Sequence, residues 1–249
     1  MLKVNQLSIE INGKRIVDGS SFFVPRGRIT SIIGESGSGK SMTISALLNI
    51  LPAGSKAAGQ AFFDNKDLLA ISNKEMSAIR GSQIFTVFQD ALNSFNPSVK
   101  MGKQLYEFSG RRIRHSVAEF HLKMDDILND LGLSKAIMEQ YPFELSGGML
   151  QRCMIACALY VRPRLLIADE PTSALDTLLQ KEFIELLKGL NEKQGTTILL
   201  ITHDLDIVAE VADKMVIMHK GKVVEVGNVA EVFERPKNAY TKRLLESRF

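Results

Sequence analysis

Residues 29–49 read ITSIIGESGSGKSMTISALLN, and this stretch predicts the centre of the fold. The β-branched run before Gly34 is typical of a buried strand, and helix-forming residues return after Ser41. Between them the chain matches the pattern G-x-x-x-x-G-K-[ST] at residues 34–41. Glycines let successive backbone N–H groups turn into one concavity, and the helix that follows adds the positive end of its dipole. The stretch therefore predicts a phosphate-binding loop.

This loop predicts a nucleotide site that includes a metal ion. We expect Lys40 to reach the β- and γ-phosphates and the Ser41 hydroxyl to ligate Mg²⁺. The alternative is a glycine- and serine-rich turn that matches the pattern by chance, and the strand before it and helix after it argue against chance. The residues predicted to bind the nucleotide in this stretch are Gly34, Glu35, Ser36, Gly37, Ser38, Gly39, Lys40, Ser41 and Met42.

The composition is that of a globular protein without membrane spans. The chain has 249 residues, of which 45% are hydrophobic and 24% charged, enough for one large domain or two lobes. No apolar run reaches the roughly 18 residues that span a bilayer, and the N-terminal residues carry no apolar signal core. A formal net charge of +3 is too small to indicate a nucleic-acid partner, so none is expected.

Two cysteines, Cys153 and Cys157, are four residues apart on a predicted helix. Metal ligation is one reading of this spacing. Because no second pair and no nearby histidine accompany them, we interpret both as reduced core residues.

The order of the predicted elements indicates an α/β protein. Alternating apolar residues before and after Asn12-Gly13 predict a hairpin, and the first third of the chain reads as antiparallel sheet around the phosphate-binding loop. A strand is predicted at 84–88, and 90–140 has helical spacing. From residue 165 onward strands alternate with helices, which indicates a parallel sheet and a single helix at the C-terminal end.

A second group of polar residues follows the predicted strand 165–168. Because ligands bind at the carboxyl ends of parallel strands, we expect Asp169 to serve the Mg²⁺ ion and Glu170 to orient and polarise the attacking water. His203 follows the strand 197–201, where it can contact the γ-phosphate and hold Glu170 and the water in line. A plain strand end and a structural histidine are the alternatives.

Residues 145–152 read LSGGMLQR, another glycine-flanked loop that opens a helix. Its small residues, Ser146, Gly147 and Gly148, leave N–H groups free for an anion. Since one chain cannot readily place two such loops on one γ-phosphate, we expect the second loop to act on the nucleotide of a neighbouring subunit.

Six segments, in this order and spacing, resemble the ATP-binding subunits of ABC transporters. They are 34–41, Gln89, 145–151, 165–170, the SALD segment at 173–176, and His203. The resemblance covers essentially the whole chain. It implies a P-loop NTPase core of the RecA-like type with an N-terminal antiparallel β subdomain and an inserted helical subdomain. It also implies one nucleotide-binding domain over 1–249, with the β subdomain and core at about 1–89 and 160–249 and the helical subdomain at about 90–159.

The same resemblance implies the roles of individual residues. Two such domains would form a head-to-tail dimer around two ATP molecules, in which Ser146, Gly147 and Gly148 contact the partner's γ-phosphate. Glu170 would be the catalytic base, His203 the switch histidine and Lys40 the third catalytic group. Mg²⁺ would be held by Ser41, Gln89 and Asp169, and Gln89 would couple it to the helical subdomain. Asp176 would signal across the dimer interface.

Three details resemble the peptide/nickel importer branch of this superfamily. They are the FQDALNSFNP segment at 88–97, Met149 in the glycine-flanked loop at 145–152 (called the signature loop below), and the RPKNAYTK tail at 235–242. Importers of this branch pair two non-identical ATPase subunits beneath two permeases fed by an external binding protein, so a peripheral place on the cytoplasmic membrane face is implied. The end at Phe249 and the Met149-Leu150 variant favour nickel or a metal chelate as the solute, with di- or oligopeptides as the alternative.

Two other classes of ABC protein are alternatives, and the chain departs from the family at one position. A soluble ABC protein of DNA repair or translation usually has two cassettes or a long coiled coil, and a regulatory cassette need not keep the catalytic groups that this chain has. The family usually carries an aromatic residue that stacks on adenine near position 11, where this chain has Ile11. We therefore expect looser selectivity for adenine.

Overall fold

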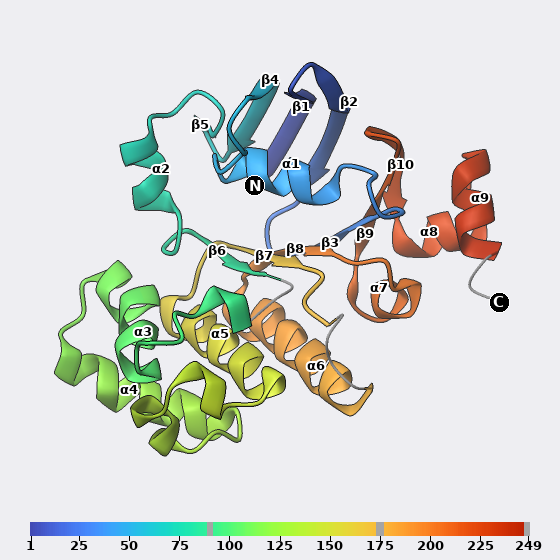
Figure 1. Ribbon diagram of the computed structural model, residues 1–249. Coiled ribbons are helices and arrows are strands. Elements are labelled where there is room, and N and C mark those ends of the chain that lie inside the picture. Colours follow the sequence, from blue (N-terminus) through green and yellow to red (C-terminus); the bar gives the residue numbers. More distant parts are fainter. Residues whose placement is uncertain (89–91, 173–176, 247–249) are drawn as a thin grey trace. The chain divides into compact units, whose positions relative to one another are not determined.

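The computed structural model describes residues 1–88, 92–172 and 177–246. The chain forms two compact units (Figure 1). The first joins Met1–Ser77 to Thr197–Phe249, and the second is Ala78–Thr196. The second unit holds two strands as well as the helices, and the subdomain boundaries near 90 and 159 stay a prediction. Gln89 and Asp176, which the sequence analysis assigns to the site, lie outside the described residues.

The N-terminal part of the first unit is an antiparallel sheet, as the sequence predicts. Its strand order is β2-β1-β4-β5, and α1 packs beside β1 and β2 (Figure 1). Asn12 and Gly13 both have positive φ, and Ile11 faces Lys14 across the turn, which is the geometry that Asn-Gly favours in a two-residue hairpin. The strands are β1 (Leu2–Ile11), β2 (Lys14–Val24), β4 (Ser55–Phe63) and β5 (Lys66–Asp67), and the helix is α1 (Lys40–Leu47).

A parallel arrangement in the first unit carries the phosphate-binding loop. Strand β3 (Ile29–Ile33) lies between β8 (Thr197–Ile201) and β9 (Lys214–His219) and is parallel to both, while β10 (Lys222–Asn228) is antiparallel to β9. Every residue of β3 and β8 is buried, as expected for parallel strands covered on both faces. Their carboxyl ends therefore meet at one edge, where ligands bind in such sheets.

The C-terminal end contains two helices where the sequence analysis expected one. Helix α8 spans Val229–Glu234. The next residue, Arg235, has a φ of −138°, which is not helical, and α9 (Ala239–Glu246) follows. The cause is Pro236, because proline disfavours the helical conformation in the residue before it. Both helices pack on β10, and α7 (Leu205–Val211) joins them around a core that includes Ile33, Val208 and Tyr240.

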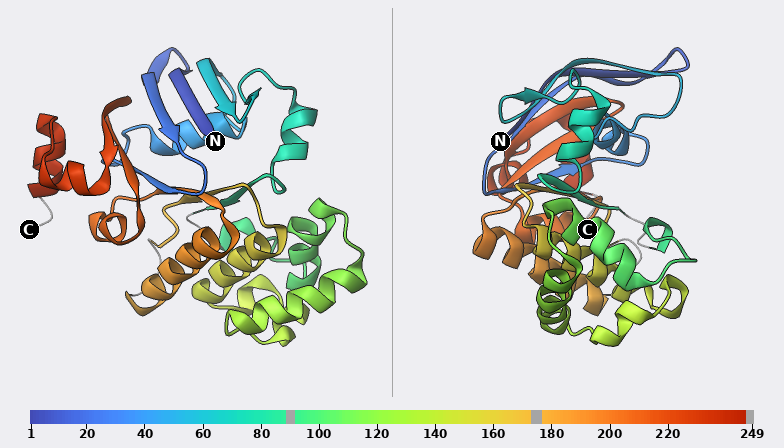
Figure 2. Two further views of the ribbon diagram at one scale, coloured as in Figure 1. Left: turned by 180° about the vertical axis from the view of Figure 1, so that it is seen from behind. Right: turned by 90° about the vertical axis from the view of Figure 1, so that its left-hand side faces the viewer.

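The second unit pairs two parallel strands with a group of helices. Strand β6 (Ile84–Val87) runs parallel to β7 (Leu165–Asp169), with Val87 beside Ala168. Figures 1 and 2 show α3, α4 and α5 gathered in this unit. The helical spacing of 90–140 predicts α3 and α4, and the glycine-flanked loop at 145–152 predicts the start of α5. The helices are α3 (Met101–Phe108), α4 (Val117–Asp130), α5 (Gly147–Val161) and α6 (Thr177–Gln194), with short 3₁₀ turns η1 (Leu92–Ser94), η2 (Gly110–Ile113), η3 (Lys135–Glu139) and η4 (Pro142–Glu144).

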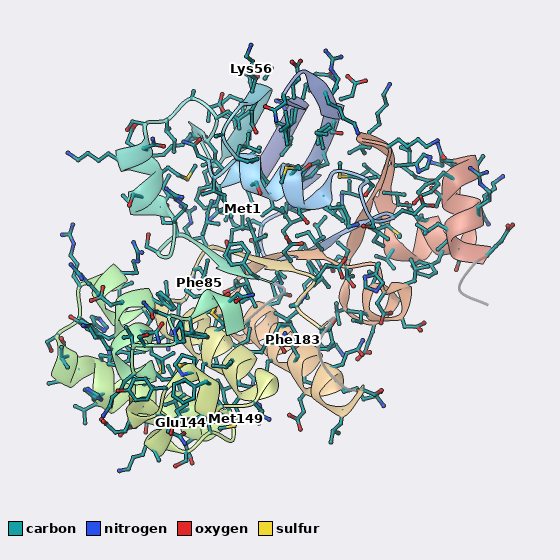
Figure 3. The ribbon with its side chains drawn as sticks, viewed as in Figure 1. Met1, Lys56, Phe85, Glu144, Met149 and Phe183 are labelled. Atoms are coloured by element: carbon teal, nitrogen blue, oxygen red, sulfur yellow. The ribbon has the colours of Figure 1, made fainter. Side chains whose placement is uncertain are left out.

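Helix α5 is the centre of the second unit. It contacts α3, α4, α6 and β6, and most of its side chains are buried. Figure 3 draws the side chains and labels Phe85 on β6 and Phe183 on α6, which are 4% and 2% exposed.

Helix α2 (Asn73–Ile79), which the sequence analysis did not predict, spans the division between the units in the sequence. Within the described ranges, no helix is both long and apolar enough to cross a membrane.

Candidate active site

The phosphate-binding loop follows the last residue of β3 directly. Helix α1 begins at Lys40 after Gly39, which has a φ of 101° and provides no side-chain cap. An L side chain is strained at this φ, so glycine is required there. The N-terminus of α1, which is the positive end of its dipole, lies at the loop. Because no side chain caps its N–H groups, this helix start suits an anion.

Gly34 shows why the loop fits a phosphate closely. A Cβ built on Gly34 would overlap the carbonyl oxygen of Met218 and lie 2.7 Å from Ser38 Oγ. On the same side, the Gly221 N–H in the turn between β9 and β10 donates to the Ser38 carbonyl at 3.1 Å. The loop is thus braced from behind by the end of β9, and only glycine fits at its first position.

Lys40 places its charge within the loop. Its side chain is 8% exposed, and Nζ donates to the carbonyls of Gly34 at 2.7 Å and Glu35 at 3.1 Å. An ammonium held among backbone carbonyls can exchange them for phosphate oxygens, with which it forms stronger, charge-assisted bonds. Ser41, one residue on, is exposed at the start of α1, where its hydroxyl is open to a ligand.

His203 reaches the same sheet edge as the loop. Strands β3 and β8 pair with Ile32 beside Ile201, and the Thr202 N–H donates to the Ile32 carbonyl at 3.3 Å. The exposed His203 follows, and Asp204 then caps α7 by accepting from two backbone N–H groups. His203 therefore follows β8 beside β3, the strand that leads into residues 34–41, and its role in the site stays a prediction.

Asp169 and Glu170 lie at the carboxyl end of β7 in the second unit. Asp169 is the last residue of the strand, and both side chains are half-buried. Glu170 has a φ of 48°, a left-handed conformation that is uncommon for a residue other than glycine, asparagine or aspartate. Such strained residues cluster at active sites, where the surrounding structure holds them. Glu170 shares this conformation with seven other non-glycine residues of the described chain, and among them it is the one at the end of β7.

The signature loop opens α5 with two of its three predicted residues exposed. Ser146 caps the helix by accepting from the Met149 N–H at 3.3 Å, and a Cβ built on Gly147 would meet no atom within 4 Å. Gly148, in contrast, is buried. Figure 3 labels Glu144 and Met149, which flank this helix start. The open space around Gly147 lets another molecule approach the backbone here.

The sequence analysis missed Gln151 as a site residue. It connects α5 to the segment after Glu170. Gln151 is 3% exposed, and its Nε2 donates to the carbonyl oxygen of Pro171. The glutamine lies within the quoted LSGGMLQR stretch, yet no local rule assigns a hydrogen-bond partner 20 residues away. This bond places the start of α5 and the carboxylates at the end of β7 in one compact unit.

Comparison with known proteins gives the family of the chain. The sequence profile of the family described as ABC transporter matches residues 17–173. The chain belongs to the ABC transporter family. Its resemblance to this family, expected from the six segments, is confirmed, and with it the α/β cassette fold and the class of enzyme, an ATPase.

Curated relatives and solved structures agree with this assignment. The oligopeptide transport ATP-binding protein OppD of Bacillus subtilis is 41% identical, and the match covers 99% of this chain and 71% of that protein. The dipeptide transport ATP-binding protein DppD of Escherichia coli is 39% identical, with 99% and 78% covered. Among solved structures, a post-hydrolysis state of the ATP-binding cassette MJ0796 bound to ADP and Pi has a TM-score of 0.81 at 26% identity, covering 92% of this chain and 99% of that one.

The two cysteines lie in the core, as expected. Both are free thiols on α5, Cys157 Sγ lies 3.9 Å from the Leu105 carbonyl, and the described residues contain no cluster of three potential metal ligands of the His, Cys, Asp or Glu type. Burial raises the pKa of Cys153 to about 12 and raises the pKa of Cys157 as well. Both side chains therefore stay protonated in the folded chain.

We expect Cys153 and Cys157 to be unreactive towards a thiol reagent such as an aromatic disulfide until the chain unfolds. The thiolate is the reactive form, and the fold both removes it and blocks access. Because folding raises both pKa values, the thiols' contribution to stability is full below about pH 9 and falls as the pH rises towards 12. Thiol titration with and without denaturant checks this, and rapid labelling of the native chain at pH 7.5 would contradict it.

Proposed function

We propose that this ABC ATPase powers the import of di- or oligopeptides as one subunit of a membrane complex with an external binding protein. The observation that carries the proposal is the match to peptide-transport ATP-binding proteins over 99% of this chain, at 41% and 39% identity. The sequence analysis favoured nickel or a metal chelate from two weak details, and the relatives do not support that choice. Peptides, which the sequence analysis gave as the alternative solute, are therefore proposed instead of nickel.

The mechanism we infer begins with ATP in the phosphate-binding loop. Residues 34–42 cradle the phosphates, with Lys40 on the β- and γ-phosphates. Bound Mg²⁺ would supply charge neutralisation between these phosphates, held by the oxygen atoms of Ser41, Gln89 and Asp169, which are the ligand type that it prefers. The exposed Ser41 hydroxyl fits this role, and the uncapped start of α1 suits the phosphates that the ion would neutralise.

We infer that Glu170 and His203 carry out the hydrolysis step, in which water displaces ADP from the γ-phosphate. Glu170 accepts a proton from the attacking water, and His203 holds the γ-phosphate in line with it. The strained backbone of Glu170 and the exposed position of His203 beside the loop support these assignments.

We propose a dimer as the active form. Ser146, Gly147 and Gly148 would contact the γ-phosphate in a second, non-identical ATPase subunit, because a helix start is an anion-binding arrangement and Ser146 and Gly147 are exposed there. Dimer closure on ATP would then be passed to two permease subunits, which places the chain at the cytoplasmic face of the membrane. The dimeric state of the cassette MJ0796, described as bound to ADP and Pi, supports such an assembly.

The test is solute-dependent ATPase activity of the complete complex, purified with the membrane proteins that this chain binds and with its binding protein. Short peptides of two to five residues are compared with nickel and nickel chelates, and the Glu170→Gln complex gives the background. Stimulation by peptides alone is the expected result. Stimulation by a metal chelate alone would restore the nickel reading, and the absence of any membrane partner would contradict the importer.

We also expect ATP and GTP to bind within a few-fold of each other. Ile11 ends β1 in a half-buried position and offers apolar contact without aromatic stacking, which is worth about 1–3 kcal/mol per base where it occurs. The measurement is a competition titration of both nucleotides against one fluorescent analogue. A preference for ATP of 50-fold or more, on the order of 2 kcal/mol, would show that another group reads the base.

A further inference from the structure

The C-terminal helix α9 reaches back to the phosphate-binding loop through Tyr240. This side chain is 6% exposed, and its Oη accepts a hydrogen bond from the Glu35 backbone N–H at 3.2 Å. Tyr240 therefore holds the main chain of the second residue of the loop, from 205 positions away in the sequence.

The ring of Tyr240 is held in place by His219. The two rings stack with centroids 3.9 Å apart and planes 26° from parallel. His219 is the last residue of β9, and two positions later the Gly221 N–H donates to the Ser38 carbonyl within the loop. One strand end thus supports the loop directly through Gly221 and indirectly through the stacked ring.

Glu225 on β10 fixes the start of α9 from the other side. Its carboxylate accepts from the backbone N–H groups of Lys237 at 2.9 Å and Asn238 at 3.0 Å. Asn238 in turn accepts from the Tyr240 N–H at 2.8 Å. A carboxylate at a helix N-terminus is favourable on its own, and here it also determines where Tyr240 points.

We propose that Tyr240 is a positioning residue that holds the phosphate-binding loop in its anion-binding shape before the nucleotide arrives. The inference rests on the proposed ATP-binding role of residues 34–42. Without the hydroxyl, the Glu35 N–H loses this partner, and binding then has to order the loop at a cost in affinity. Burial above all raises the pKa of Tyr240, so the hydroxyl stays neutral at physiological pH, in the form that accepts from the Glu35 N–H.

The test is Tyr240→Phe, which removes the hydroxyl and keeps the ring on His219. We expect the Kd for a fluorescent ATP analogue with Mg²⁺ to rise about five- to tenfold, the effect of one hydrogen bond. In ATPase assays of the complex, KM for ATP should rise by a similar factor while kcat stays within about twofold, because Tyr240 does not touch the reacting atoms. The thermal midpoint without nucleotide should move by less than about 3 °C.

Tyr106→Phe is the matched control. It removes a tyrosine hydroxyl that donates to a backbone carbonyl, that of His115 at 3.1 Å, within the second unit. It should leave the Kd for ATP unchanged. A Tyr240→Phe variant that binds ATP like the wild type would overturn the inference, as would one that loses thermal stability alone.

Glu225→Ala provides an independent route to the same site. If Glu225 acts through Tyr240, its removal weakens ATP binding, and the double variant with Tyr240→Phe binds no more weakly than the weaker single variant. Fully additive losses would overturn the connection between the two residues. Failure of the wild-type chain to bind ATP would instead contradict the proposed function, so the two failures are distinguishable.

Discussion

Replacing Glu170 with glutamine is expected to lower ATP turnover about 100- to 1,000-fold, with ATP binding retained. Glutamine keeps the size of the side chain but cannot accept a proton from water, and a general base contributes about 10²–10⁴-fold to such reactions. Because the amide also keeps the side-chain length at the left-handed backbone position, the fold should be preserved. Single-turnover hydrolysis and equilibrium binding of a fluorescent ATP analogue measure the two quantities separately.

Glu192→Gln is the control for this experiment. Glu192 is an exposed carboxylate on α6 in the same unit, and neutralising it removes the same charge far along the chain from β7. It should leave turnover within about twofold. If Glu170→Gln retained full turnover, the assignment of the base would be wrong, and a loss of ATP binding together with turnover would indicate a structural role instead.

Replacing Gly34 with alanine should raise the Kd for ATP about 100-fold. The added Cβ would overlap the Met218 carbonyl oxygen, so the loop has to move away from the end of β9. Displacement of the loop breaks two or more charge-assisted hydrogen bonds to phosphate, each worth about 1.5–3 kcal/mol. The forced contact also costs about 1–3 kcal/mol of folding free energy, which thermal unfolding without nucleotide would show.

Gly189→Ala distinguishes this effect from glycine replacement in general. Gly189 lies within α6, and a Cβ there would meet no atom within 4 Å. Alanine is favoured over glycine in a helix by about 1 kcal/mol, so this variant should be as stable as the wild type or more so and should bind ATP normally. An unchanged Kd for Gly34→Ala would show that the loop tolerates displacement from β9.

Most of the fold follows from local patterns in the sequence. The Asn12-Gly13 turn requires positive φ at both positions, and only a few residues satisfy that condition, so the hairpin is encoded in adjacent residues. The buried strands β3 and β8 are short apolar runs of the length that parallel sheets use. The division of the C-terminal end into α8 and α9 was missed although Pro236 signals it, because the apolar spacing on both sides reads as one helix.

The residues of the candidate site also differ in whether a local pattern predicts them. The sequence identifies residues 34–41, Glu170 and His203 by contiguous motifs at strand ends. Gln151 and Tyr240 carry no such signal, since their partners lie 20 and 205 positions away. The solute class was equally hard to read, because the Met149-Leu150 variant and the end at Phe249 were weighed without the relatives that favour peptides.

The sequence by itself determined where the loop at residues 34–41 lies and that its pattern is that of a phosphate-binding loop, because its conformation depends on glycines and a helix start within eight consecutive residues. Tertiary structure alone decided what holds that loop in shape. The Met218 carbonyl behind Gly34, the Gly221 N–H on Ser38 and the Tyr240 hydroxyl on Glu35 come from β9, the turn after it and α9. Local rules describe a residue's own backbone and its near neighbours, whereas these contacts exist only once β9 has paired with β3 and α9 has packed on β10.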